Sequence, residues 1–79
     1  MIFMGIEMLK KADILSNNNQ KIKITTIDGR VLFGVSWGIQ PATDPETGDE
    51  LDYSCLAFMQ DNGEYDELTN EEIKSVEKA

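Results

Sequence analysis

The sequence has no histidine, and its only cysteine is Cys55. Without histidine the chain lacks the commonest general base and the commonest metal ligand, and a lone cysteine cannot form a disulfide within the chain. No apolar run approaches the roughly 18 residues that a membrane-spanning helix requires. The first residues also lack the basic flank and the cleavage site of a signal peptide. We therefore expect a cytoplasmic protein with no attachment to a membrane.

Positive charge is also scarce, and it is unevenly distributed. The chain carries 7 Lys and Arg against 15 Asp and Glu, a net charge of −8. Residues 1–43 hold five basic and three acidic residues, a net charge of +2, whereas residues 44–79 hold two basic and twelve acidic residues, a net charge of −10. The acidic half repels nucleic acid within about 10 Å at physiological salt. Such a surface promotes solubility, and it can also recruit a basic protein partner or mimic nucleic acid.

The remaining composition is that of a small globular protein. The apolar fraction is 41% and the charged fraction is 28%, and no repeat or low-complexity segment interrupts the chain. A chain of 79 residues buries only roughly 60–65% of the surface that its unfolded form exposes, so the core is thin. We predict one domain over residues 1–79.

The first periodic segment predicts an amphipathic helix over about residues 4–16. Its apolar residues recur at spacings of three and four, at Met4, Met8, Leu9, Ala12 and Leu15. The Ser-Asn-Asn-Asn sequence of residues 16–19 ends the helix, because short polar side chains compete for the backbone and Asn tolerates the left-handed conformation.

From residue 21 onward the hydrophobic period changes from 3.6 to 2, which is typical of β-strands. We predict strands over about residues 21–27, 31–40, 52–60 and 64–68. Asp28-Gly29-Arg30 predicts a tight turn, and Asn62-Gly63 predicts a two-residue type I′ turn between the third and fourth strands. Residues 41–52 are expected to form a mobile acidic loop, whose carboxylates lack the spacing of a calcium-binding loop.

The C-terminal segment is compatible with two kinds of secondary structure. Thr69-Asn70-Glu71-Glu72 has the pattern of a capping box and predicts the start of a helical or 3₁₀ turn. Residues 73–77 then fit either the rest of a helix or a fifth strand, and the spacing of Ile73 and Val76 alone fits a helix slightly better.

Residues 28–41 resemble the first sequence motif of the Sm and Sm-like (LSm) proteins. That motif has an Asp/Asn-Gly-Arg turn, a glycine four residues after the arginine, another glycine four residues later, and then an aromatic or aliphatic residue. Here these positions are held by Asp28, Gly29, Arg30, Gly34, Gly38 and Ile39. The resemblance implies a mainly β, SH3-like small barrel of five strands with an N-terminal α-helix and a 3₁₀ turn before the last strand. We therefore expect a fifth strand over about residues 73–77.

The resemblance does not extend to the RNA-binding features of the family. In RNA-binding Sm proteins an Asn in the loop after the second strand contacts a base, and Asp44 stands at the corresponding place here. The second family motif, with an Arg-Gly pair after the fourth strand, has no counterpart. The candidate nucleic-acid contacts are therefore the basic residues of the first hairpin and the residue at the base-contacting position, namely Lys21, Lys23, Arg30 and Asp44.

The second strand carries an apolar row on one face, made of Val31, Phe33, Val35 and Trp37. In the register that the resemblance implies, Leu32 and Ile39 face the interior and the row faces outward, where the helix or a second subunit must cover it. In the inverted register the row is simply core. The row is our candidate self-association surface. We favour a dimer over a ring, because the fourth and fifth strands, which pair between subunits in Sm-like rings, both carry acids.

The sequence contains no recognisable catalytic constellation. Cys55 has no histidine to activate it. Paired carboxylates would need a pocket that separates their pKa values, and Asp66 and Glu67 point to opposite faces of the predicted strand. We predict no enzymatic activity, no catalytic residue, no metal site and no cofactor. The expected function is a non-catalytic Sm-like binding or assembly module that self-associates. The alternatives are an RNA- or DNA-binding Sm-like oligomer that uses the basic first hairpin, and an acidic nucleic-acid mimic that binds a basic protein.

Overall fold

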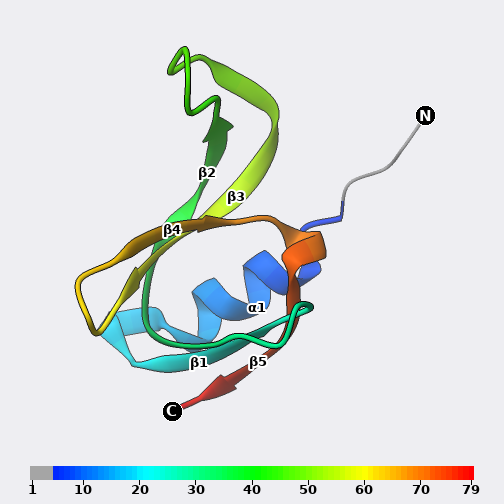
Figure 1. Ribbon diagram of the computed structural model, residues 1–79. Coiled ribbons are helices and arrows are strands. Elements are labelled where there is room, and N and C mark those ends of the chain that lie inside the picture. Colours follow the sequence, from blue (N-terminus) through cyan, green and yellow to red (C-terminus); the bar gives the residue numbers. More distant parts are fainter. Residues whose placement is uncertain (1–4) are drawn as a thin grey trace.

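The computed structural model describes residues 5–79, which form one helix, two 3₁₀ turns and five strands (Figure 1). In chain order these elements are α1 (Glu7–Leu15), η1 (Asn17–Asn19), β1 (Ile22–Thr26), β2 (Val31–Thr43), β3 (Glu50–Gln60), β4 (Tyr65–Leu68), η2 (Asn70–Glu72) and β5 (Ile73–Lys78). The predicted mainly β class is confirmed, as are the N-terminal helix and the 3₁₀ turn before the last strand. Met4, at the predicted start of the helix, lies outside the described residues.

The five strands form one antiparallel sheet in the order β4-β3-β2-β1-β5. β4 and β5 are therefore its two edges, and the sheet is not closed into a barrel. The prediction of a closed small barrel is wrong in this respect. The sheet curls around α1, which lies across its inner face (Figure 1). None of the described helices is long and apolar enough to cross a membrane.

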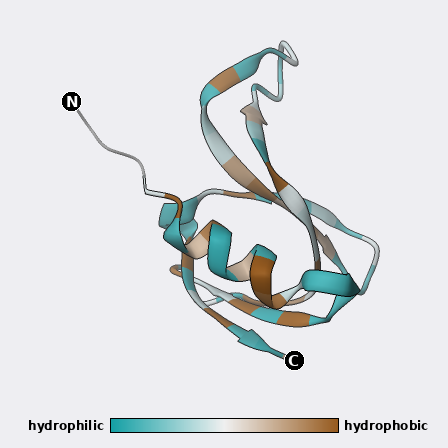
Figure 2. Cartoon of the chain, turned by 180° about the vertical axis from the view of Figure 1, so that it is seen from behind, coloured by the Kyte–Doolittle hydropathy of each residue, from teal (hydrophilic) through white to brown (hydrophobic). Residues whose placement is uncertain are grey.

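The core lies between α1 and the inner face of the sheet. Along β1, hydrophobic residues alternate with hydrophilic ones (Figure 2) and burial alternates in the same way, so this strand turns one apolar face toward the helix. The buried cluster draws on the helix and on every strand, and consists of Leu9, Ala12, Ile22, Ile24, Leu32, Leu56, Phe58, Leu68, Ile73 and Val76. This single cluster confirms that the apolar face of the predicted helix is core.

Gly34 is the point at which β2 changes partners. β2 pairs with β1 from Val31 to Gly34 and with β3 from Gly34 onward. A Cβ at Gly34 would lie 2.0 Å from the backbone oxygen of Met59, so only glycine allows the two strands to approach this closely. The glycine of the sequence motif therefore has a direct steric role in the curved sheet.

Beyond the core, β2 and β3 continue as a two-stranded ribbon, which we call the arm (residues 39–55; Figure 1). The predicted long loop over residues 41–52 is wrong, because β2 runs through Pro41 to Thr43 and β3 begins at Glu50. Proline is tolerated here because β1 does not extend along the arm, so this part of β2 is an edge. Ile39, expected in the interior, pairs with Leu56 but is 36% exposed, since it lies where the arm leaves the core.

Both short hairpins close with a three-residue loop whose glycine has a positive φ. In the β3–β4 hairpin, Gly63 N–H donates to the Gln60 oxygen at 3.0 Å and Gln60 N–H donates to the Glu64 oxygen at 2.8 Å. Gly63 has a φ of +89°, whereas Asn62 is not in the left-handed region. The predicted type I′ turn, which requires a positive φ at both residues, is therefore wrong.

The end of the chain confirms the capping box and the fifth strand. Thr69 and Glu72 form the reciprocal pair of hydrogen bonds that defines the box, and the Thr69 N–H donates to Glu72 Oε1 at 2.9 Å. β5 follows directly and pairs with β1, which buries Ile73 and Val76. Strand pairing has overridden the helical spacing of these two residues.

Candidate functional site

The outer face of the sheet, opposite α1, exposes most of the apolar row of β2. Val31, Phe33 and Trp37 are 50%, 44% and 62% exposed, respectively, and Val35 is half-buried. Leu32, between them in sequence, is buried in the core. The outward register is therefore the one that the fold adopts, and the inverted register is excluded.

The apolar row has a shallow depression at one end. This depression has a volume of about 290 Å³ and is lined by Val31, Phe33, Gln60, Asp61 and Asn62. The backbone N–H of Asp61 donates to the Phe33 oxygen at 2.9 Å, which holds the β3–β4 turn beside the row. The row therefore combines flat apolar surface with a small hollow that a protruding side chain could fill.

Trp37 is placed on the outer face by a bulge in β2. Ser36 pairs with Phe58 and Gly38 pairs with Ala57, so Trp37 is an extra residue without a partner in β3. Gly38 has a φ of +115°, which few other residues adopt. Bulges re-aim side chains, and this one turns the indole toward solvent.

Hydrogen bonds to the C-terminal end of α1 hold the bulge in place. The Ser36 N–H donates to Ser16 Oγ at 2.8 Å, and Ser36 Oγ donates to Asp13 Oδ1 at 3.0 Å. Ser16 is buried and its hydroxyl donates to the Gln20 oxygen at 2.9 Å. Asn18 and Asn19, which lie in η1, both have a φ of 60°, whereas Ser16 directly after α1 has a φ of −91°, so the left-handed residues follow the helix end and do not form it.

A polar hollow lies between this helix end and the bulge. It has a volume of about 400 Å³ and is lined by Asp13, Ser16, Asn17, Asn18, Asn19, Ser36, Trp37 and Gly38. Sequence reasoning identified the asparagines only as a helix stop and did not foresee this hollow.

Trp37 belongs to a group that we call the aromatic–carboxylate cluster, made of Trp37, Gln40, Thr43, Tyr65 and Glu67. The ring centroids of Trp37 and Tyr65 are 6.0 Å apart with an interplanar angle of 39°. Tyr65 and Glu67 are alternate residues of β4 and so lie on the same face of the sheet. Two exposed aromatic rings and a carboxylate thus lie side by side on the outer face.

Neutral donors orient the carboxylate of Glu67. Gln40 Nε2 donates to Glu67 Oε2 at 2.9 Å and to the Tyr65 hydroxyl oxygen at 2.9 Å. The Tyr65 hydroxyl donates to the same Oε2 at 3.2 Å, and Thr43 Oγ1 donates to Oε1 at 3.3 Å. The small Ala57 pairs with Glu67 in the sheet, which lets these long side chains lie flat on the surface.

The cluster perturbs two titratable groups. Burial raises the pKa of the Tyr65 phenol, and the negative charge of Glu67 raises it further. Burial likewise raises the pKa of the Cys55 thiol, and the charges of Glu67 and Glu72 add to this effect. Cys55 is fully buried, so the thiol is both shielded and protonated at neutral pH, as an unreactive cysteine is.

The structure pairs each of the three candidate basic residues with an acid. Lys21 Nζ lies 2.9 Å from Asp61 Oδ2, and Lys23 Nζ lies 3.9 Å from Glu77 Oε2. The third, Arg30, lies in the β1–β2 turn and is described next. The charge that these residues would offer to a phosphate is therefore partly neutralised.

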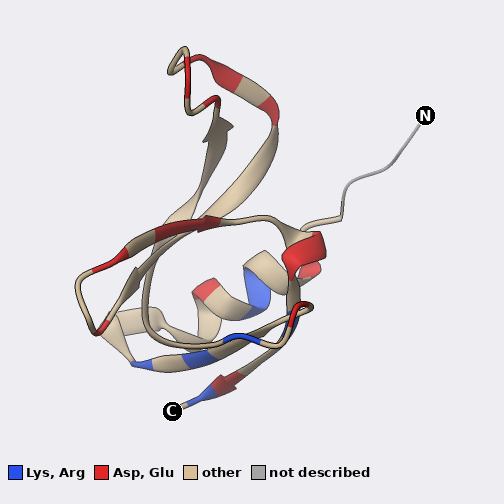
Figure 3. Ribbon diagram, viewed as in Figure 1, with Lys and Arg blue, Asp and Glu red and all other residues tan. Residues whose placement is uncertain are grey.

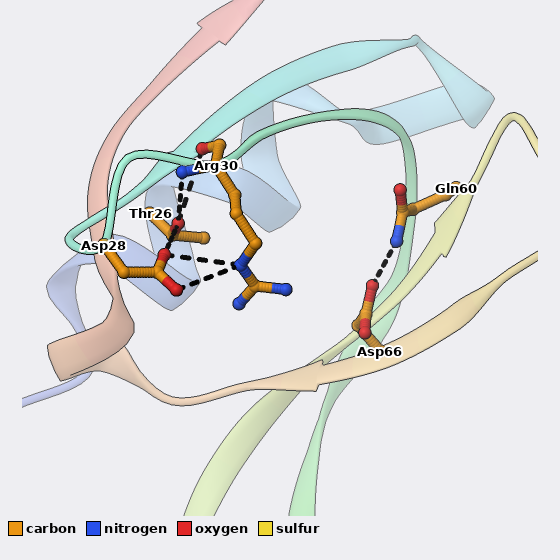
Figure 4. A network of polar contacts seen from close by, with 5 residues as sticks. All are labelled: Thr26, Asp28, Arg30, Gln60 and Asp66. Atoms are coloured by element: carbon orange, nitrogen blue, oxygen red, sulfur yellow. Dashed lines mark hydrogen bonds and ion pairs between the residues drawn. The ribbon is translucent and has the colours of Figure 1, made fainter.

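The β1–β2 turn is a closed polar network (Figure 4). Arg30 Nε lies 3.2 Å from Asp28 Oδ2, the Arg30 N–H donates to Thr26 Oγ1 at 3.0 Å, and Thr26 Oγ1 donates to Asp28. The hydrogen bond from Thr26 lowers the pKa of Asp28, and Arg30 lowers it further. Figure 4 also shows Gln60 donating to Asp66 on the neighbouring strands.

Asp44, the fourth candidate nucleic-acid contact, lies far from the other three. It begins the turn at the tip of the arm, where its Oδ1 accepts the N–H of Glu46 at 2.8 Å and the N–H of Thr47 at 3.3 Å. Acidic residues gather at this tip, along β4 and in η2, whereas β1 is basic (Figure 3). The four candidates therefore do not form one nucleic-acid surface.

Of the aromatic–carboxylate cluster, sequence reasoning identified only Trp37, and for a different role. The alternation of β4 is enough to predict that Tyr65 and Glu67 lie on one face. The bulge that brings Trp37 beside them cannot be predicted in the same way, because Gly38 is its only indication in the sequence. Within residues 5–79, no group of three or more Cys, Asp and Glu side chains is arranged to hold a metal ion.

Comparison with known proteins adds little. No protein-family model matches the chain, and no curated protein matches it. Two chains of solved structures match, one of them a 1.9 Å crystal structure from the Northeast Structural Genomics Consortium. That protein is 22% identical, with a TM-score of 0.46, and the match covers 76% of this chain and 98% of the other. A match of this quality says nothing about function.

Proposed function

We propose that this protein is a non-catalytic, Sm-like binding module that self-associates as a dimer through the outer face of β2. The observation that carries the proposal is the exposure of Val31 and Phe33 beside the depression at one end of the row, whereas Trp37 lies at the other end. A contiguous apolar surface of this kind marks an interaction site in soluble proteins. Burying it between two subunits would also supplement a core that is thin in so short a chain.

Three features support the Sm-like part of the proposal. Gly34 has the steric role that the sequence motif gives it, the helix precedes β1, and η2 precedes β5. β4 and β5, the strands that pair between subunits in Sm-like rings, are the free edges of the sheet. Here β4 is short and carries Asp66 and Glu67, and short, charged edges resist pairing. A dimer through the outer face is therefore favoured over a ring.

A second candidate function, binding of a basic protein, is favoured by the distribution of charge. The acids of residues 44–79 gather on the arm, β4 and η2 (Figure 3). An RNA- or DNA-binding role is less well supported, because Lys21, Lys23 and Arg30 are each paired with a carboxylate.

Light scattering on the purified protein tests the dimer. We expect the mass of a dimer for the wild type and of a folded monomer for the double variant Val31→Ser with Phe33→Ser. Ile27→Ser is the matched control, because Ile27 is an exposed apolar residue of the β1–β2 turn outside the row. A wild type that is monomeric at every concentration, or a double variant that remains dimeric, would contradict the proposal.

A further inference from the structure

Glu67 is a half-buried carboxylate that has neutral partners only. Gln40, Tyr65 and Thr43 donate hydrogen bonds to it, whereas no Lys or Arg of residues 5–79 comes within 4.0 Å of its oxygens. By contrast, Asp28 and Asp61 each have a cation as partner. The donated hydrogen bonds fix the direction in which the carboxylate points. Glu67 is thus an oriented negative charge that no cation of the described chain neutralises.

The aromatic rings beside Glu67 have the chemistry to bind a cation. The face of an indole or phenol ring attracts a cation that lies within about 6 Å of its centroid. Trp37 and Tyr65 are 62% and 44% exposed, so their rings are accessible to a ligand. Tyr65 joins the two parts of the cluster, because its ring lies beside Trp37 while its hydroxyl contacts Glu67.

The cluster is held in place before any ligand arrives. The bulge that presents Trp37 is fixed to α1 through Ser16 and Asp13, and Gln40 ties Tyr65 and Glu67 together from β2. A preorganised site loses less side-chain entropy on binding than a mobile one does.

We propose that Trp37, Tyr65 and Glu67 form a recognition site for an arginine side chain of a basic partner protein. A guanidinium is planar, so it stacks on an aromatic ring while its N–H groups donate to a carboxylate, and this site offers both surfaces side by side. The proposal rests on the second candidate function, binding of a basic protein, and names the contact that would make it specific. It does not require the dimer.

The surroundings of the cluster favour the approach of such a partner. The arm on one side carries the exposed acids Glu46, Asp49, Glu50 and Asp52, and Glu64 immediately precedes β4 on the other. A surface of one charge sign increases the rate at which an oppositely charged partner associates. The negative potential of these acids would attract any basic segment, whereas the aromatic–carboxylate cluster would bind a guanidinium specifically.

Trp37 is the only tryptophan of the chain, so its fluorescence reports directly on the site. The probe is a short peptide, acetyl-Gly-Arg-Gly-Arg-Gly-amide, and its twin has citrulline, the neutral isostere of arginine, at both positions. We expect a saturable change with the arginine peptide and binding at least about tenfold weaker with the citrulline twin, since a charge-assisted hydrogen bond and a cation–π contact are lost.

Matched variants separate the site from the negative potential of the surrounding acids. Glu67→Gln should weaken binding of the arginine peptide about tenfold, whereas Glu46→Gln, which removes the same charge from the arm tip, should change it less than about twofold. Thermal melting confirms that both variants are folded. Equal binding of the two peptides, or equal weakening by the two variants, would overturn the proposal.

The dimer and the arginine site can be tested independently of each other. The double variant Val31→Ser with Phe33→Ser keeps the aromatic–carboxylate cluster, so it should still bind the arginine peptide after it has become monomeric. Loss of arginine binding in this folded variant would overturn the claim that the site is independent of the dimer. Light scattering of the wild type without peptide reports on the dimer alone.

Discussion

Tyr65 connects the exposed aromatic ring of Trp37 to the carboxylate of Glu67. Burial and the negative charge of Glu67 raise the pKa of the Tyr65 phenol above the usual value of 10.0, so the phenol is neutral well beyond pH 7. A neutral phenol can donate to Glu67, and that hydrogen bond needs the proton. At neutral pH the phenol of Tyr65 therefore keeps the proton that it donates to Glu67.

The pH dependence of Tyr65 gives a prediction. Because its pKa is raised on folding, the neutral phenol contributes its full share of stability below pH 10.0, and this share is lost as the pH rises through the folded-state pKa. Glu67→Gln should lower the pKa of Tyr65, because it removes the nearby negative charge, and should reduce this alkaline loss. Ultraviolet titration in a Tyr53→Phe background, where one phenol remains, measures the shift.

The same titration of Glu46→Gln is the control for net charge. Glu46 lies in the turn of the arm, so its removal should leave the Tyr65 curve where it is. If Glu67→Gln and the wild type titrate alike, the carboxylate does not act on the phenol.

At the scale of elements, α1 depends on a residue from the other end of the chain. The helix begins after Ile6, whose side chain has no oxygen to cap it. Instead the Met8 N–H donates to Asn70 Oδ1 at 2.7 Å, a contact between residues 62 positions apart. Asn70 thus supplies the acceptor that an N-cap residue normally supplies, and it links the start of α1 to η2.

We expect Asn70→Ala to lower the free energy of unfolding by about 1 kcal/mol, because a helix N–H loses its acceptor. Asn70→Asp retains the acceptor and places a negative charge at the helix N-terminus, so it should be nearly neutral. Urea denaturation of the three proteins measures both effects. Equal losses in the two variants would show that the contact with Met8 is not what Asn70 contributes.

The arm shows how an element can be longer than its local signals suggest. Pro41 and the acids after it predict a loop, yet β2 and β3 still pair here, with Pro41 opposite Ser54 and, after a shift in register, Thr43 opposite Glu50. The turn itself is closed by the Asp44 N–H, which donates to the Asp49 oxygen at 2.9 Å, and by the Gly48 N–H, which donates to the Asp44 oxygen at 2.8 Å. Backbone hydrogen bonds of this kind cannot be predicted from amino-acid composition.

At the scale of the whole molecule, charge is the dominant feature. The chain has a net charge of −8, and the acids cluster on the arm, β4 and η2 (Figure 3). Repulsion among them destabilises the folded state and is weakened by salt. The melting temperature should therefore rise as sodium chloride is raised from about 10 to about 150 mM.

Millimolar calcium at matched ionic strength should add nothing to this rise. The Asp44 carboxylate already accepts the N–H groups of Glu46 and Thr47, and the other acids of the arm are not spaced as calcium ligands. A calcium-specific increase of several degrees would reveal a metal site on the arm, and a fall in melting temperature with sodium chloride would contradict the repulsion.

The sequence by itself determined the features that depend on near neighbours. Alternation along Ile22 to Thr26 predicted β1, Gly29 and Gly63 marked the two turns, and Thr69 with Glu72 predicted a helical or 3₁₀ turn. In each case the physical cause lies within a few residues: side-chain period, tolerance of positive φ, or a reciprocal cap.

Only the tertiary structure decided the features that depend on distant contacts. Asn70 meets Met8, and Trp37 meets Tyr65, because the sheet and the β2 bulge bring them together. The last segment became a strand and not a helix because β1 offered an edge to pair with. Hydrogen bonds between strands and packing across the core form only when the whole chain folds, because single contacts do not offset the entropy cost of ordering it. No local pattern in the sequence therefore predicts them.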